Sequence, residues 1–170
     1  MAFPLGFYIL VVVGSAIMLL WLSRGPFFVP TRRKYVSRII TMLNLKEGEK
    51  VIDLGSGDGR LLIAIAEAGG IAHGFEHNPL LVWRSRRNAR KAGLQERIVV
   101  YGKNFWDADI SEYDAVVIYG IPYIMARLEQ KLRSELKKGA RVVSYSFSFP
   151  TWKPIEKDKA VYLYVMGEKK

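Results

Sequence analysis

The stretch Val51–Arg60, VIDLGSGDGR, decides how the rest of this chain is interpreted. A short apolar run leads into glycines at the alternate positions 55, 57 and 59, which is typical of a buried strand that turns tightly into a helix. The spacing G-x-G-x-G is not the G-x-G-x-x-G of dinucleotide-binding loops, and the lysine and hydroxyl residue of a P-loop do not follow it. The glycines therefore predict either a turn that serves packing alone or a loop for another kind of ligand.

Acidic side chains narrow the choice of ligand for this glycine loop. Asp53 stands near the end of the expected strand, and Asp58 lies within the turn. Two carboxylates beside a pyrophosphate would repel it, whereas they would attract an ammonium or a sulfonium group. Glu76 ends the next expected strand, where an acid characteristically accepts hydrogen bonds from a ribose diol. Together these residues indicate S-adenosylmethionine, a nucleoside with a cationic amino-acid tail.

Strand and helix patterns alternate along the chain from residue 31 onward. Strands are expected at 50–55, 71–76, 97–102, 113–120, 140–147 and 159–167, and helices at 31–44, 60–70, 78–93 and 122–139. Thr31 and Asn78 are expected to cap the helices that follow them. The alternation predicts a Rossmann-like, doubly wound α/β sheet, mostly parallel with an antiparallel last strand. Ligands of such sheets bind beyond the carboxyl ends of the strands.

The N-terminal segment differs in character from the rest of the chain. Residues 1–23 carry no charged side chain, and Phe3–Leu22 would span about 30 Å as a helix, the thickness of a bilayer's hydrocarbon core. Arg24 and the basic run Arg32–Lys34 follow, and positive charge stays on the cytoplasmic side of a membrane. We therefore expect a single-pass membrane protein with one N-terminal transmembrane helix and its catalytic domain in the cytoplasm.

A cleaved signal peptide and a buried core helix are the alternative interpretations of this segment. A signal peptide would have a basic start and a cleavage site of small residues, but no Lys or Arg precedes the apolar run. A retained anchor is favoured, and it divides the chain into a transmembrane anchor at 1–23, a linker at 24–30 and an S-adenosylmethionine-dependent domain at 31–170.

The composition excludes several kinds of chemistry. With no cysteine among its 170 residues, the chain has no disulfide, no thiolate nucleophile and no thiolate metal site. Its two histidines, His73 and His77, are too few and too close together for an ordinary zinc site, so no metal is expected. The formal net charge of +10 favours anionic neighbours.

Part of that positive charge lies in one expected helix, along Arg84–Lys91. A solvated helix face is the first interpretation of this run. Contact with anionic lipid headgroups is the second, because the domain would be tethered near a membrane. Nucleic acid is the last choice, since no aromatic residues are interleaved with the charges.

Six segments of the chain resemble one family of class I, seven-strand methyltransferases. They are PFFVPT, DLGSGDGR, GFEHNP, NFWDADISEYDAVVIYGIP, LEQKLRSEL and GARVVSYSFSFPTW, and they lie within Gly25–Trp152. Their order and spacing are similar to the membrane-associated protein lysine methyltransferases of mitochondria, whose members modify the adenine nucleotide translocase and the ATP synthase c-subunit. Archaeal protein lysine methyltransferases share the first half of the pattern. The resemblance implies a methyltransferase that uses S-adenosylmethionine to modify lysine.

The resemblance also implies which residues contact the cofactor. Carried over by position, they are Pro30, Thr31, Asp53, Gly55, Gly57, Glu76, Asn104, Phe105 and Tyr119. Asp53 and the two glycines would hold the amino-acid end, and Glu76 would hold the ribose. Residues 104–105 would meet the adenine, and residues 29–31 would lie over the methionyl moiety. Tyr119 would border the methyl-transfer channel.

Two departures from the family pattern are visible in the sequence. Relatives usually have aspartate where this chain has Asn104, which bears on the adenine contact. Mitochondrial members carry an arginine in the segment where this chain has Ser146 or its neighbour, which bears on the protein substrate.

An apolar channel matters more to a lysine acceptor than a catalytic acid or base. Methyl transfer is an in-line displacement on a sulfonium, so alignment supplies most of the acceleration and no acid–base residue is expected. Apolar surroundings favour the neutral amine that attacks. Tyr119, Pro122 and Tyr123 are expected to form this substrate channel, with strand-to-helix packing as the alternative role for the two tyrosines.

The expected partner is a lysine on a membrane protein, reached from a membrane that Phe3–Leu22 would enter. Methylation of a lipid or a small molecule is the first alternative, and a non-catalytic cofactor-binding scaffold is the second. No insertion that would form a lid interrupts the expected sheet, and an open site suits a macromolecule better than a small metabolite.

Overall fold

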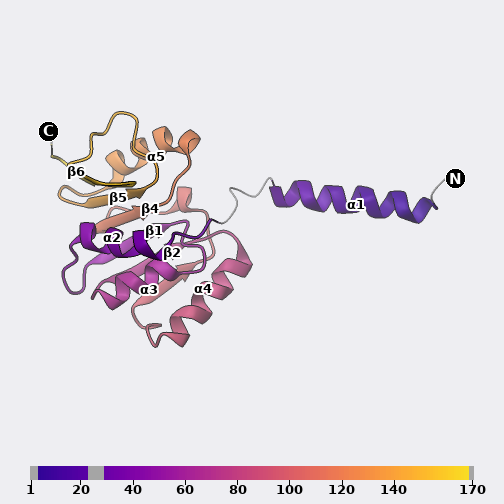
Figure 1. The fold of residues 1–170 in the computed structure, drawn as a ribbon, viewed down its shortest axis with the longest axis horizontal. Helices are drawn as coiled ribbons and strands as arrows, with labels where there is room; N and C mark the ends of the chain where they lie inside the picture. The colour runs from indigo at the N-terminus through magenta and orange to yellow at the C-terminus, as the bar shows by residue number, and fades with distance from the viewer. Residues whose placement is uncertain (1–3, 23–28, 169–170) are drawn as a thin grey trace.

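Residues 4–22 and 29–168 are described by a computed structural model, which begins with a helix and continues with alternating strands and helices (Figure 1). The helices are α1 (Leu5–Leu22), α2 (Arg33–Leu43), α3 (Arg60–Glu67), α4 (Pro79–Lys91), α5 (Pro122–Glu135) and the 3-10 helix η1 (Phe105–Asp107). The strands are β1 (Lys50–Leu54), β2 (Ile71–Phe75), β3 (Ile98–Tyr101), β4 (Ala115–Ile118), β5 (Arg141–Tyr145), β6 (Glu156–Asp158) and β7 (Val161–Val165). They form one sheet in the order β3-β2-β1-β4-β5-β7-β6.

Five parallel strands, β1 to β5, confirm the predicted fold class. β1 pairs with β2 on one side and with β4 on the other, so the strand order reverses beside it. β7 runs antiparallel to β5, as expected for the last strand. β6 also pairs antiparallel with β7, and the pattern did not indicate it because Glu156–Asp158 contains only charged side chains.

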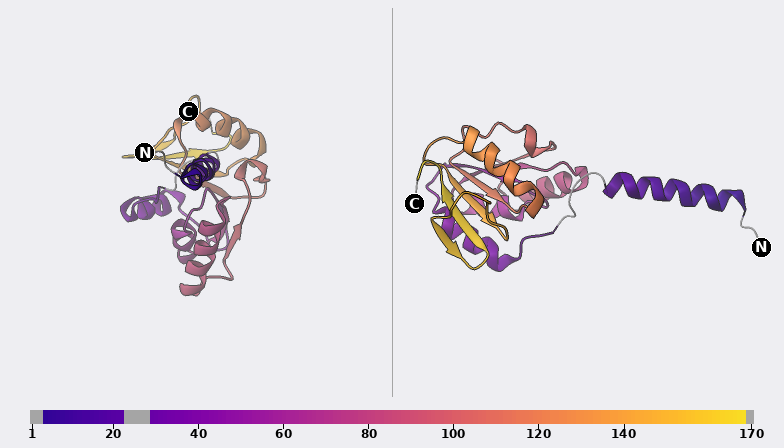
Figure 2. Two further views of the ribbon diagram at one scale, coloured as in Figure 1. Left: turned by 90° about the vertical axis from the view of Figure 1, so that its right-hand side faces the viewer. Right: turned by 90° about the horizontal axis from the view of Figure 1, so that it is seen from above.

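Alternating side chains place an apolar core on each face of the sheet. Val51 and Val117 point to the face that α2, α3 and α4 cover. Ile52 and Val116 point to the other face, where α5 and the segment 105–113 pack. Successive strand residues point to opposite faces, and a parallel sheet is buried on both. Figure 2 shows the resulting layers, with α5 on the opposite side of the sheet from α2 and α3.

The two predicted helix caps have different outcomes. Asn78 caps α4 as expected, since its Oδ1 accepts hydrogen bonds of 3.0 and 3.4 Å from the N–H groups of the second and third helix residues. Thr31 does not cap α2, because that helix begins at Arg33 and its capping position is Arg32. The carbonyl of Thr31 instead accepts a 2.9 Å hydrogen bond from Arg60 Nη1, which holds this segment against the start of α3.

Helix α1 lies apart from the sheet (Figure 1). Its properties differ from those predicted for the N-terminal segment. It has 18 residues. Among the residues that the structure describes, no helix is both long and apolar enough to cross a membrane. The prediction of a single-pass membrane protein with a cytoplasmic catalytic domain, inserted through Phe3–Leu22, is therefore wrong.

The alternative of a buried core helix is also wrong for α1. Leu5 and Leu10 are 76% and 75% exposed, and the side chains of α1 that the structure describes contribute to neither core. Of the predicted linker at 24–30, residues 24–28 lie outside the described residues, as does Phe3. The predicted domain boundaries remain predictions.

Gly74 in β2 is a position where a side chain would collide with the glycine loop. A Cβ atom there would lie 2.6 Å from both Leu62 Cδ1 and Ser56 Oγ. We expect Gly74→Ala to lower the free energy of unfolding by about 1–3 kcal/mol, measured by urea unfolding of the whole chain. Gly102→Ala is the matched control, because its nearest neighbour, a Val82 methyl, is 3.9 Å away. An equal loss in the two variants would contradict the prediction.

Candidate active site

A cavity of about 1150 Å³ opens at the carboxyl ends of β1, β2 and β4. The strand order reverses at this edge, which is where doubly wound sheets bind their ligands. The walls come from the segment before α2, the glycine loop, the turn after β2, the start of η1 and the ends of β4 and β5.

All but one of the residues predicted to contact a cofactor line this cavity. The exception is Asn104, which is exposed and whose Oδ1 accepts a 3.2 Å hydrogen bond from the N–H of Trp106. Asn104 therefore caps η1, and its neighbours Lys103 and Phe105 line the cavity instead. Contact between any of these residues and a cofactor stays a prediction.

The carboxylate of Glu76 holds the glycine loop in place. Its Oε2 accepts a 3.1 Å hydrogen bond from the N–H of Gly57, and its Oε1 accepts a 2.8 Å bond from the N–H of Asn78. Gly55 and Gly57 have φ angles of 95° and 55°, a region that side-chain-bearing residues rarely adopt. The loop therefore needs its glycines for the backbone path, and Glu76 fixes that path to the end of β2.

Asp53 is a buried acid with no cationic partner acting on it. It lies in β1 with 5% of its surface exposed. Burial, together with the negative charges of Glu76 and Asp58, raises the pKa of Asp53 to about 7. A ligand ammonium or sulfonium placed beside this carboxyl would stabilise its ionised form.

Asp58 differs from Asp53 because it has its own cation. Arg60 Nε and Nη2 donate to the two oxygens of Asp58 at 3.0 and 2.7 Å. Burial raises the pKa of Asp58, but the hydrogen bonds and charge of Arg60 outweigh burial and hold that pKa below its ordinary value. The sequence interpretation treated Asp58 as a second attraction for a cationic ligand. In the structure, Asp58 instead holds Arg60 in place, and Arg60 donates a hydrogen bond to the carbonyl of Thr31, which lines the cavity.

The far end of the cavity is aromatic. Tyr119 follows β4 and Tyr145 ends β5, and their ring centroids lie 4.6 Å apart. Tyr35 of α2 also packs on Tyr145, with a centroid distance of 4.6 Å. Phe147 lines the cavity beyond β5, where its carbonyl accepts a 2.6 Å hydrogen bond from Ser144 Oγ. The cavity thus joins a carboxylate end to an apolar, aromatic end.

Pro122 and Tyr123, predicted as part of the substrate channel, do not line the cavity. Tyr123 is 77% exposed, because the first turn of α5 directs it outward. Ile121 and Ile124 line the cavity in their place, together with Tyr119 as predicted.

Residues at the end of β5 were missing from the predicted site. Tyr145 and Phe147 line the cavity, and both lie in the segment GARVVSYSFSFPTW, but neither was assigned a role in the site. The signal that would have found them is positional, because they stand at the carboxyl end of a parallel strand. Across the parts of the chain that the structure describes, no three His, Asp or Glu side chains gather where a metal ion would bind.

Comparison with protein families gives a match over most of the cavity-bearing domain. The family described as ANTKMT methyltransferase domain matches residues 53–156. A lysine N-methyltransferase of the ATP synthase c-subunit, from Mus musculus, is 41% identical over 160 residues, which is 88% of this chain. The alignment spans 64% of the mouse protein, so this chain corresponds to only part of that relative's length.

Two further proteins are similar along nearly their whole length. A protein-lysine N-methyltransferase of Saccharolobus islandicus is 36% identical, covering 84% of this chain and 95% of that protein. A crystal structure of an RNA methyltransferase from Salinibacter ruber, in complex with S-adenosyl-L-homocysteine, superposes with a TM-score of 0.79. It is 33% identical and covers 84% of this chain and 96% of its own.

The buried Asp53 should make the ligand-free protein less stable as the pH rises. Its pKa is raised from 3.8 to about 7, so between these values the folded state keeps a proton that the unfolded state has released. Stability therefore falls from about pH 4 to about pH 7, by about 4 kcal/mol in all. Asp53→Asn does not titrate, so we expect it to raise the melting temperature at pH 8 and to change it little at pH 4.

Thermal melts of the whole chain at both pH values would check this expectation. Asp107→Asn removes an exposed acid near the same sheet edge and serves as the control. A melting temperature at pH 8 that is the same for wild type and Asp53→Asn would show that Asp53 is not held in an unfavourable charged state.

Proposed function

The chain belongs to the family of the ANTKMT methyltransferase domain, and from this premise we propose that it transfers a methyl group from S-adenosylmethionine to a lysine side chain of another protein. One observation carries the proposal: a single cavity that joins a carboxylate end to an aromatic end. The carboxylate end suits a cationic nucleoside, and the aromatic end suits an uncharged amine. Lysine-specific relatives support the acceptor.

The cofactor would bind at the carboxylate end of the cavity. S-adenosylmethionine supplies an electrophilic methyl group on a sulfonium. Asp53, whose pKa is raised by burial and by neighbouring carboxylates, would accept a hydrogen bond from its ammonium. Glu76 has lone pairs beyond the two that hold the loop, and these would accept from the ribose diol. Phe105 would lie against the adenine, and Thr31, fixed by Arg60, would cover the methionyl part.

The aromatic end would prepare the lysine for attack. Lowering a lysine pKa from about 10.4 to about 7 corresponds to about 4.6 kcal/mol, which the surroundings must supply. Tyr119, Ile121 and Tyr145 line this end and replace water with apolar surface, which disfavours the charged amine. Alignment of the amine with the sulfonium methyl supplies the rest of the rate acceleration, so no side chain needs to act as an acid or base.

The acceptor protein is proposed from the names of the relatives. Since the Mus musculus protein is a lysine N-methyltransferase of the ATP synthase c-subunit, we take a lysine of that c-subunit as the first acceptor to test. An RNA acceptor is the second candidate. It is favoured by the structure from Salinibacter ruber, which is described as an RNA methyltransferase, and by the net charge of +10.

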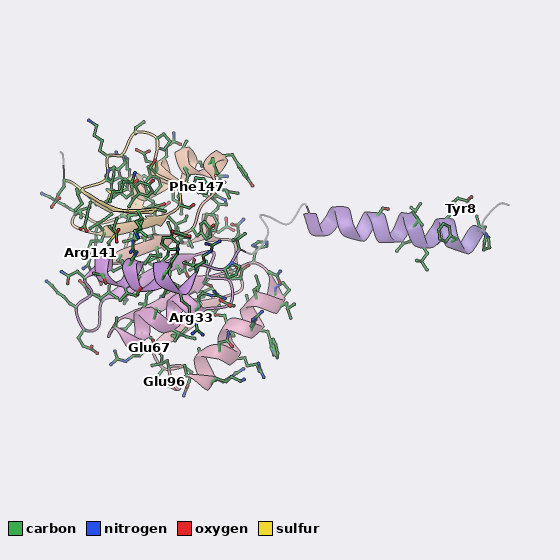
Figure 3. The ribbon with its side chains drawn as sticks, in the orientation of Figure 1. Tyr8, Arg33, Glu67, Glu96, Arg141 and Phe147 are labelled. Atoms are coloured by element: carbon green, nitrogen blue, oxygen red, sulfur yellow. The ribbon has the colours of Figure 1, made fainter. Side chains whose placement is uncertain are left out.

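Cofactor binding should depend on both buried acids. We expect Asp53→Ala and Glu76→Ala each to weaken S-adenosylmethionine binding at least about tenfold, because a hydrogen bond to a charged group contributes about 1.5–3 kcal/mol. Titration calorimetry on the whole chain would measure it. Glu67→Ala removes an exposed acid from α3 and is the matched control (Figure 3). Unchanged affinity in both buried-acid variants would remove the cofactor assignment.

Methyl transfer should occur on lysine. We expect the purified chain to move a labelled methyl group from S-adenosylmethionine to the ATP synthase c-subunit, and mass spectrometry to locate the methyl group on a lysine. Total RNA is included as a parallel acceptor. Label that enters RNA and no protein would replace the proposal by the second candidate.

A further inference from the structure

The mouth of the cavity lies between two segments that carry many basic side chains and no acid. Residues 29–45 contain four Lys or Arg, and residues 78–95 contain five more. Several basic residues elsewhere in the described chain have acidic partners, such as Arg97 with Glu47 and Arg141 with Glu49. Within these two segments, only Arg38 forms an ion pair with an acid of the described residues, which is Asp158.

Helix α4 presents one face that the fold does not use. Its buried face consists of Val82, Ser85 and Ala89, which pack toward the sheet. Its outer face consists of Leu80, Trp83, Arg84 and Arg87, at the spacing i, i+3, i+4 and i+7 that brings side chains together on a helix. We call these four residues the α4 outer face.

The α4 outer face combines exposed apolar area with unpaired cations. Leu80 and Trp83 are 61% and 56% exposed. Arg87 lies 5.7 Å from the centroid of the Trp83 ring. No acidic group among residues 4–22 and 29–168 forms an ion pair with Arg84 or Arg87. A tryptophan beside arginines is the composition that dominates binding energy at protein interfaces.

The same face is continuous with the cavity. Leu80 lines the cavity and is also exposed, so it belongs to both surfaces. Helix α4 also contacts the glycine loop directly, because Asn88 Nδ2 donates a 2.9 Å hydrogen bond to the carbonyl of Asp58. A protein whose lysine enters the cavity beside Leu80 would therefore extend along α4.

We propose that the α4 outer face is the docking surface for the acceptor protein, and that it binds an acidic segment with an apolar residue next to the methylated lysine. This inference rests on the proposed function. The charge is complementary, since the acceptor's own acids would meet Arg84 and Arg87 while its lysine enters the cavity toward the aromatic end at Tyr119 and Tyr145. A protein segment fits better than a chain of phosphates, because Arg87 already covers a face of Trp83 on which a base would stack.

Two lysine peptides would test the docking surface. The first carries glutamate and leucine around a single lysine, and the second is the same peptide with glutamine in place of glutamate. We expect the wild-type chain to methylate the acidic peptide with a KM at least about tenfold lower than that of the neutral one. Arg84→Glu/Arg87→Glu should remove this preference, leaving S-adenosylmethionine affinity and kcat close to those of the wild type.

The control variant is Lys46→Glu/Lys138→Glu, which makes the same change in charge at exposed positions on the opposite edge of the sheet, just before β1 and β5. An equal rise in KM for both variants would show a long-range effect of net charge and overturn the docking surface. Equal KM values for the two peptides with the wild-type chain would also overturn it, while the lysine activity would stand.

Direct binding separates the docking surface from the proposed activity. Anisotropy of the fluorescently labelled acidic peptide is measured with no turnover needed, so binding lost only in Arg84→Glu/Arg87→Glu supports the surface even where no lysine is methylated. Vesicles containing phosphatidylglycerol and a polyuridine RNA are the other probes. If the α4 variant loses binding to either probe but not to the acidic peptide, the surface is one for phosphates and the proposal is wrong.

Discussion

The Glu76 carboxylate holds together the sheet edge on which the site is built. Its two oxygens accept hydrogen bonds from the N–H groups of Gly57 and Asn78, so the glycine loop and the start of α4 share one anchor. Glu76 is 7% exposed, and such bonds to a charged acceptor are stronger than bonds between neutral groups. Asp53 and Leu80, which both line the cavity, belong to the two segments that this anchor joins to β2.

Two acids of the glycine loop stand in opposite electrostatic situations. Asp58 has Arg60 as a bidentate partner, so its charge is compensated within the fold. Asp53 has only other carboxylates acting on it, and its pKa is raised to about 7. The uncompensated charge costs stability while the site holds no cation, and a bound cation would offset that cost. Asp53 therefore lowers the stability of the ligand-free protein, and it is also the acid that suits a cationic ligand.

The molecular surface also has both charges that are compensated within the fold and charges that are not. The cavity interior collects carboxylates, although the chain has a formal net charge of +10. Among the described residues, most cations of the segments around α2 and α4 have no acidic partner, whereas Lys50, Lys137 and Arg141 at the opposite edge of the sheet are paired. A cationic cofactor would match the carboxylates of the interior, and an acceptor with acidic residues around its lysine would match the cations outside it.

Local sequence was sufficient for the alternating strands and helices, for the Asn78 cap and for the acids at the strand ends, because each depends on periodicity or on neighbours within a few residues. The contacts between distant segments were decided only by the tertiary structure. In the folded chain Arg60 binds both Asp58 and Thr31, and Tyr123 points outward. The tertiary structure also brought Tyr145 to Tyr119. The physical reason is that a side chain's partner and direction are set by how helices and strands pack. Residues far apart in the chain, such as Thr31 and Arg60, meet only after the sheet has formed.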